Sequence, residues 1–335
     1  MSIPSRLIGY GAYNLCFDRW LGKPPSGGPI FFAAIRNGGW PVNLVKVICF
    51  RNSGIEGLPE TRRVTLYDNR KAINTAFIDN LNNLVDQARQ FNFSVQVCLF
   101  HFHAITAPAE TPENVPDVLN PANLGTNNYQ KLTSFFNISD QARLNEQIRF
   151  VRAIGDRLRG YNNVLWELAN EVRIQGGTPA QNATGNCGLV AWLKRMRTEL
   201  ITSLQGRPFV ITTSTGIDNE RVTFSPSRPV DGCNESALPA EYFDFHAGQW
   251  GAVDNFATGI ANAKARVAGY NRNAFLIVND DGVNNTMRTA DWVKARAKEA
   301  FRQRVHYASK QEYPPGVPLD TLTLDKLREA NNEQP

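Results

Sequence analysis

The sequence is poor in the residues and segments that typify several common classes of protein. Five cysteines in 335 residues are too few for a disulfide scaffold and lack the spacing of a zinc finger. No apolar run approaches the roughly 20 residues that cross a bilayer. The first residues, MSIPSRLIGYGAYN, lack the basic and apolar regions of a signal peptide. We therefore expect no membrane partner and no signal peptide in this chain.

The charge is mildly positive, without a basic cluster. Lys and Arg number 36 against 31 Asp and Glu, a net charge of +5, and the basic residues are scattered. A nucleic-acid partner would require a clustered basic face, so none is expected. We also expect no cofactor, and nothing in the sequence indicates an oligomeric state.

The cysteines fall into two settings. Cys49 and Cys98 lie in apolar strand candidates and are expected in the core. Cys187 and Cys233 lie in polar segments that we predict as loops, NATGNCGL and VDGCNES. A disulfide between them and two unpaired thiols fit the sequence equally well. A disulfide would imply an oxidising, extracytoplasmic compartment, so the sequence leaves the localisation open.

Apolar, β-rich runs alternate with amphipathic stretches along the chain. Strands are predicted at 7–13, 43–50, 94–100, 163–170, 208–214, 242–248, 274–280 and 304–310. Helices are predicted at 72–91, 139–159, 189–204, 253–267, 289–304 and 319–330. This order predicts an α/β fold of the (β/α)8 TIM-barrel type. The competitor is an open doubly wound sheet, but GYGAYN in the first strand is not the glycine-rich phosphate turn of that fold.

The predicted barrel is a single domain over residues 1–335, because no linker composition and no internal repeat interrupts it. One segment, 106–139, is rich in Pro and Asn and is predicted as a long loop insertion after the third strand. In a barrel, such a loop lies over the face where the strands end. That face is where the chemistry of these barrels occurs.

Polar residues at the end of the fourth strand are the main functional signal. The stretch NNVLWELANEVR passes from apolar residues to Glu167, Asn170 and Glu171. Because side chains alternate along a strand, Glu167, Ala169 and Glu171 are predicted to face the barrel interior together. A buried carboxylate needs a partner, and Lys46 in the second strand is the predicted partner of Glu167. The competing interpretation of Glu171 is a cap of the next helix.

VLWELANE resembles the fourth-strand motif of clan-A glycoside hydrolases, the cellulase and mannanase type, in which an apolar run ends in Glu-x-x-Asn-Glu. The resemblance implies that Glu171 is the general acid/base and that Asn170 holds a sugar hydroxyl. LFHFH, at the end of the third strand, and FDFHAGQW, on the sixth, are compatible with the order of that family. They imply that His101, His103 and His246 contribute to substrate binding.

The seventh strand departs from that family. It ends in AFLIVNDDGVNN, with Asp280 and Asp281 before Gly282, where the family usually has a Glu shortly before a Gly. Alignment on Gly282 implies that Asp280 is the nucleophile of a retaining glycosidase, with Asp281 among the substrate-binding residues. Two alternatives stay open. Asp280 or Asp281 acts as the base of an inverting enzyme, or the protein is a catalytically inactive carbohydrate-binding pseudoenzyme.

Two further residues belong to the predicted carbohydrate site. Trp250, just after the sixth strand, is a candidate sugar-stacking platform, and Arg51, at the end of the second strand, is expected to supply a cation. No metal is expected. The rival interpretation is a metal-dependent amidohydrolase with His101, His103 and His246 as ligands. In that family the His-x-His pair ends the first strand, whereas two predicted strands precede it here.

Overall fold

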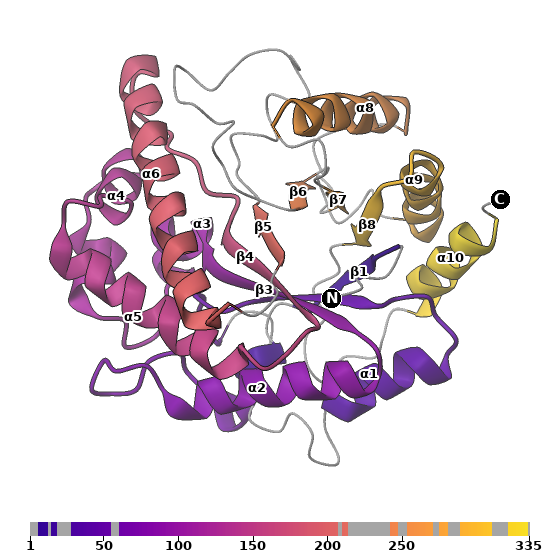
Figure 1. Cartoon of the computed structure of the whole chain (residues 1–335), viewed down its shortest axis with the longest axis horizontal. Coiled ribbons are helices and arrows are strands. Elements are labelled where there is room, and N and C mark those ends of the chain that lie inside the picture. Colours follow the sequence, from indigo (N-terminus) through magenta and orange to yellow (C-terminus); the bar gives the residue numbers. More distant parts are fainter. Residues whose placement is uncertain are drawn as a thin grey trace.

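The protein folds into a closed barrel of parallel strands, seen in a computed structural model (Figure 1). Each strand pairs with its neighbour in chain order, and β8 pairs with β1. The strands are β1 (Ile8–Gly11), β2 (Leu44–Ile48), β3 (Ser94–His101), β4 (Val164–Asn170), β5 (Val210–Thr213), β6 (Tyr242–His246), β7 (Phe275–Asp280) and β8 (His306–Ser309). All eight predicted strands are confirmed, and the structure is the predicted (β/α)8 barrel.

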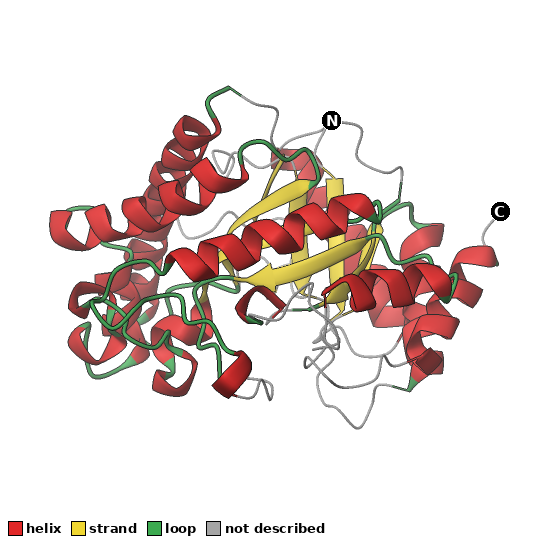
Figure 2. Ribbon diagram, turned by 90° about the horizontal axis from the view of Figure 1, so that it is seen from below, coloured by secondary structure: helices red, strands yellow, loops and turns green. Residues whose placement is uncertain are grey.

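The structure describes the chain in ten ranges. They are 6–12, 15–18, 28–54, 60–206, 210–213, 242–246, 253–270, 275–280, 289–309 and 321–333. Around the strands, the helices of these ranges form an outer layer (Figures 1 and 2). They are α1 (Gly28–Asn37), α2 (Thr75–Gln90), α3 (Phe102–Thr106), α4 (Asn128–Phe135), α5 (Gln141–Leu158), α6 (Pro179–Leu204), α8 (Val253–Tyr270), α9 (Ala290–Arg302) and α10 (Thr321–Asn332). No helix within these ranges combines the length and the apolar content needed to span a membrane.

The predicted helices start within three residues of the observed positions, except for α6. α5 is predicted from 139 and starts at Gln141, where Asp140 is the cap and its side chain accepts a hydrogen bond from the Arg143 backbone. α6 begins ten residues before the predicted start at 189, where Thr178 forms a capping box with Gln181. Cys187 therefore lies in a helix and not in a loop. It is disulfide-bonded, whereas Cys233 lies outside the described residues.

The segment 106–139, predicted as a long loop insertion after the third strand, includes short helices. It contains three short 3-10 helices and α4. Asn120 and Asn127 cap two of these helices by accepting hydrogen bonds from backbone amides. Two of the Asn residues that we interpreted as a loop signal thus act as helix caps. The segment follows β3 and α3, and so it lies at the carboxyl end of the barrel.

An aromatic cluster joins the strands to the helices outside the barrel. The ring centroid of Phe100, on β3, lies 5.0 Å from that of Phe150 on α5 and 5.1 Å from that of Trp192 on α6. Phe50, just after β2, lies 5.5 Å from Phe100. Trp192 donates from Nε1 to Gln147 Oε1 at 2.9 Å, which satisfies its buried polar atom. Phe100 therefore faces the helices.

The barrel interior is filled by side chains in layers. The first layer is apolar and joins five separate segments through Leu7, Leu44, Leu165, Ile277 and Ala308. Ile48 of β2 and Cys98 of β3 form a further apolar contact nearer the carboxyl ends of the strands. Between these levels, the paired positions Lys46 and Gln96 introduce polar side chains into the interior. This polar level is the base of the candidate site.

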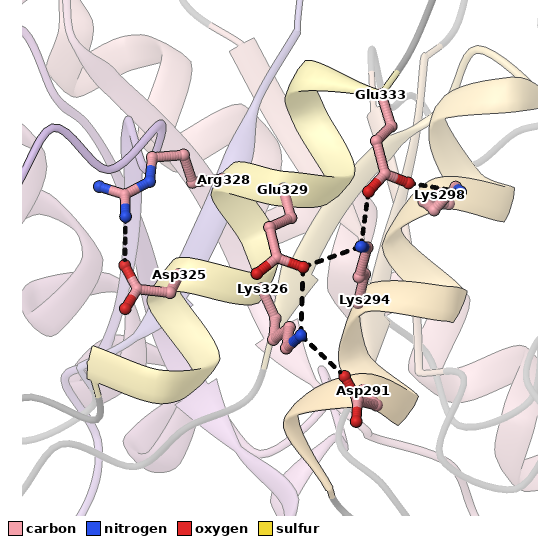
Figure 3. Close-up of polar contacts among 8 residues, drawn as sticks. All are labelled: Asp291, Lys294, Lys298, Asp325, Lys326, Arg328, Glu329 and Glu333. Atoms are coloured by element: carbon pink, nitrogen blue, oxygen red, sulfur yellow. Dashed lines mark hydrogen bonds and ion pairs between the residues drawn. The ribbon is translucent and has the colours of Figure 1, made fainter.

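The last helix, α10, is attached to α9 by a network of ion pairs (Figure 3). Lys294 Nζ lies 2.8 Å from Glu329 Oε2 and 2.5 Å from Glu333 Oε1, and Lys298 Nζ lies 2.6 Å from Glu333 Oε2. Hydrogen bonds from the two lysines lower the pKa of Glu333 to about 2. Because these groups are close to solvent, salt weakens the network.

Candidate active site

A buried ion pair crosses the barrel interior between β2 and β4. Lys46 Nζ lies 2.9 Å from Glu167 Oε2 and 3.1 Å from Oε1, and the two side chains are 5% and 0% exposed. Gln96, on the intervening β3, donates from Nε2 to Glu167 Oε2 at 3.0 Å. A carboxylate buried this completely requires such partners. The predicted Lys46–Glu167 pair is confirmed.

The predicted alternation along β4 fails at the end of the strand. Lys46 Nζ also donates to Asn170 Oδ1 at 2.7 Å, so Glu167 and Asn170 both face the interior although they are three residues apart. Ala169, which we predicted to face inward, is buried in the large hydrophobic cluster that includes the aromatic rings outside the barrel. The prediction that Glu167, Ala169 and Glu171 share one face is therefore wrong.

In the neighbouring strand β3, the alternation of inward and outward side chains is interrupted at the same level. Its residues remain paired with β4, Phe100 opposite Ala169 and His101 opposite Asn170. Cys98 faces the interior and Phe100 faces the helices, while His101 Nδ1 lies 3.0 Å from Asn170 Nδ2. Because the ladder couples the two strands, they shift together, and the shift brings His101 and Asn170 into contact.

Glu110, at the end of the 3-10 helix Pro108–Glu110, is a site residue that the sequence analysis missed. Its Oε2 atom lies 3.6 Å from His101 Nε2 and 3.7 Å from Arg51 Nε. Burial by itself raises the pKa of Glu110, but the contact with His101 and the charge of Arg51 outweigh burial and lower the pKa below its usual value. The only signal in the sequence is a carboxylate shortly after the third strand.

Burial dominates the electrostatics of His101 and lowers its pKa to about 4. Contact with Glu110 and the charge of Glu171 act in the opposite direction, whereas Arg51 and His103 lower the pKa further. His101 is therefore neutral near pH 7. Arg51, expected as a cation at the mouth, is only 5% exposed and lies beside this group of residues.

Glu171 directly follows the last residue of β4 and is half-buried. Its φ angle of 56° lies in the left-handed region, which costs a non-glycine residue about 1–3 kcal/mol and is found preferentially at functional sites. The competing interpretation of Glu171 as a helix cap is wrong. The next helix, α6, begins at Pro179 and is capped by Thr178.

In a regular strand, the spacing of His101 and His103 would place both side chains on one face, but the structure does not have this arrangement. β3 ends at His101, and His103 lies in α3 with an exposed side chain. The two ring centroids are 5.2 Å apart. Both ring nitrogens of His101 face protein groups, Nδ1 toward Asn170 and Nε2 toward Glu110. The metal-ligand interpretation requires two histidine side chains on one face of a strand, and His101 and His103 do not have this arrangement.

Of four other predicted site residues, two are placed only by their backbone and two lie outside the described part of the chain. The backbones of His246 and Asp280 end β6 and β7, but their side chains lie outside the described part of the chain, as do Trp250 and Asp281 entirely. Because every strand pair is parallel, Asp280 and Glu171 lie at the same, carboxyl end of the barrel.

Comparison with solved structures identifies barrels of the same architecture. The endo-β-1,4-mannanase of Thermotoga petrophila has a TM-score of 0.65 and 14% identity, over 98% of this chain and 76% of that one. The endo-1,4-β-mannanase of Rhizomucor miehei has a TM-score of 0.65 and 13% identity, over 99% and 97%. Endo-glycoceramidase II of Rhodococcus sp. has a TM-score of 0.61 and 13% identity, over 96% and 78%.

The chain has the fold of these glycoside hydrolases. The fold implied by the fourth-strand motif is thus confirmed, over nearly the whole chain. No family model and no curated protein matches the sequence. Within this glycoside hydrolase fold, Asn170 and Glu171 stand at the carboxyl end of β4, where barrels of this type carry their active sites.

Proposed function

We propose that this protein is a glycosidase, a single (β/α)8 domain that hydrolyses a glycosidic bond in an oligo- or polysaccharide. The observation that carries the proposal is the Asn170–Glu171 pair at the carboxyl end of β4, in a fold shared with glycoside hydrolases. The strained backbone at Glu171 and the buried polar group beneath it add support. Such groups are expensive to bury and suit a site that orients a ligand.

Glu171 is the proposed general acid/base and Asp280 the proposed nucleophile. Glu171 protonates the leaving oxygen while Asp280 attacks the anomeric carbon, and Glu171 then removes a proton from the water that releases the sugar from Asp280. A retaining enzyme requires about 5–5.5 Å between the two carboxyl groups. Since aspartate is one methylene shorter than the usual glutamate, the β7 backbone has to stand correspondingly closer to the substrate.

The remaining site residues are proposed to bind the sugar. Asn170 holds a hydroxyl group next to the scissile bond, and His101 and Arg51 lie buried beside it. His103, His246, Asp281 and Trp250 are the other proposed substrate-binding residues. The similar structures act, by their descriptions, as mannanases, a glycoceramidase and cellulases. We therefore infer a β-linked glycan as the first substrate class to test.

The test is turnover of β-mannan, cellulose derivatives, a glycosphingolipid and aryl β-glycosides by the wild type and by carboxamide variants. We expect Glu171→Gln and Asp280→Asn each to lose at least about 10²-fold in kcat with unchanged circular dichroism. Glu113→Gln, at an exposed carboxylate after β3, is the matched control and should keep wild-type turnover.

The outcomes separate the alternatives. Loss of activity in Asp281→Asn but not in Asp280→Asn would show that we chose the wrong aspartate, and an inverted anomer in the product would exclude retention. Tight binding of a glycan by a wild type that turns over none of the panel would favour the carbohydrate-binding pseudoenzyme and refute the glycosidase.

A further inference from the structure

Four side chains connect the barrel interior to the mouth in a line of polar contacts, which we call the relay: Lys46, Asn170, His101 and Glu110. Lys46 Nζ lies 2.7 Å from Asn170 Oδ1, Asn170 Nδ2 lies 3.0 Å from His101 Nδ1, and His101 Nε2 lies 3.6 Å from Glu110 Oε2. The residues come from β2, β4, β3 and the segment after β3.

The interior end of the relay sets the direction of its two hydrogen bonds, from Lys46 to Asn170 and from Asn170 to His101. An ammonium group only donates, so Lys46 requires the oxygen of the Asn170 amide at its side. The amide nitrogen is then turned toward His101, and this nitrogen also only donates. His101 Nδ1 must therefore accept. A neutral imidazole that accepts at Nδ1 carries its single proton on Nε2.

The outer end of the relay independently favours the proton on His101 Nε2. His101 Nε2 faces a carboxylate oxygen of Glu110, which only accepts. An unprotonated Nε2 would direct its lone pair at that oxygen, inside a group of residues that is largely shielded from water. The ammonium at one end and the carboxylate at the other thus select one and the same tautomer.

We infer that the relay holds His101 as a neutral imidazole protonated on Nε2, with Lys46 and Glu110 as positioning residues that act from opposite ends. The catalytic meaning of this state rests on the proposed function. A neutral His101 places no positive charge beside Glu171, which suits a carboxyl group that has to carry a proton to the leaving oxygen. His101 itself then orients Asn170 and transfers no proton.

The test is ¹⁵N NMR of the histidine rings in the full chain at pH 7, which distinguishes protonated from unprotonated ring nitrogens. The chain has 4 histidines, and the His101 signals are identified by their disappearance in His101→Asn. In the wild type, we expect Nε2 to be protonated and Nδ1 unprotonated. In Lys46→Met and in Glu110→Gln, the intact end should preserve this tautomer. In Lys46→Met/Glu110→Gln, the single tautomer should be lost.

Two results would overturn the inference: a proton on His101 Nδ1 in the wild type, or an unchanged single tautomer in the folded double variant. Should the double variant not fold, Asn170→Asp decides the question. Its carboxylate keeps an oxygen toward Lys46 and turns a second one toward His101, so Nδ1 should become protonated. An Nδ1 atom that stays unprotonated opposite Asp would contradict the relay. None of these measurements requires turnover. An inactive protein would therefore refute the proposed function and leave the inference about the His101 tautomer unchanged.

Discussion

Loss of the Lys46 ammonium is the sharpest test of how the barrel interior holds the site. In Lys46→Met the side chain keeps its length, but Glu167, with a fully buried side chain, loses the cation at 2.9 Å. Removing one partner of a buried ion pair costs about 3–5 kcal/mol, because the other charge stays buried. The hydrogen bond from Gln96 to Glu167 at 3.0 Å remains and offsets only part of that cost.

The measurement is the free energy of unfolding in urea, followed by tryptophan fluorescence. The second arm is Lys46→Met/Glu167→Gln, which removes both charges and should cost only about 1–2 kcal/mol, the value of one or two lost hydrogen bonds. The surface control is Lys71→Met, which removes an ion pair to Asp117 with side chains 49% and 72% exposed. Its effect should stay within about 0.5 kcal/mol.

The reasoning depends on a favourable coupling between Lys46 and Glu167. A double variant that is less stable than Lys46→Met alone would refute it, because removing the second charge would then bring no relief. A Lys46→Met variant no less stable than Lys71→Met would also refute it, since it would mean that water reaches Glu167.

Three further predictions concern stability. Hydrogen bonds from Lys294 and Lys298 lower the pKa of Glu333 to about 2, against about 4.3 in the unfolded chain. The contribution of Glu333 to the stability of the fold should therefore be present above pH 4.3 and be lost as the pH falls to 2. The difference in melting temperature between the wild type and Glu333→Gln should vanish at pH 2 and become smaller in salt. Burial lowers the pKa of both His101 and His306 to about 4, against about 6.5 in the unfolded chain. The free energy of unfolding should therefore fall as the pH is lowered from 6.5 to 4. A free energy of unfolding that does not change over this pH range would contradict the burial of the two side chains. Phe100→Ala should cost about 3–5 kcal/mol in urea unfolding, and a loss below 1 kcal/mol would contradict its packing against the helices.

Local patterns were sufficient to locate the strands. Runs such as NLVKVICF and SVQVCLF are apolar at most positions, and the strands β2 and β3 within them are buried at every position, as expected for a barrel wall covered on both faces. Turn-forming residues hide two helix starts in the sequence. α1 begins at Gly28 within the Pro- and Gly-rich stretch KPPSGGP, and α6 begins with a polar segment that contains Gly185 and Gly188. Buried side chains of α1 and the capping box of α6 outweigh the low helix propensity of these residues.

The candidate site was predictable in part. The Asn170–Glu171 motif and the Lys46–Glu167 pair were visible in the sequence, because both depend on residue type within a strand and on the alternation of a regular strand. Alternation fails at Ala169, and no pattern of one strand could reveal this, since the shift is shared with β3 through the paired ladder. The predicted His101–His103 face failed for the related reason that β3 ends at His101.

The sequence by itself determined the order and nature of the strands, the closed barrel that they form, and the identity of the polar residues at the end of β4. The strands and the polar residues follow from spacing within short segments, on which burial acts directly, and the barrel follows from the order of strands and helices along the chain. Only the tertiary structure decided that Lys46, Asn170, His101 and Glu110 contact one another. Their meeting depends on barrel closure and on the path of the segment after β3, which place residues distant in the chain within hydrogen-bonding reach.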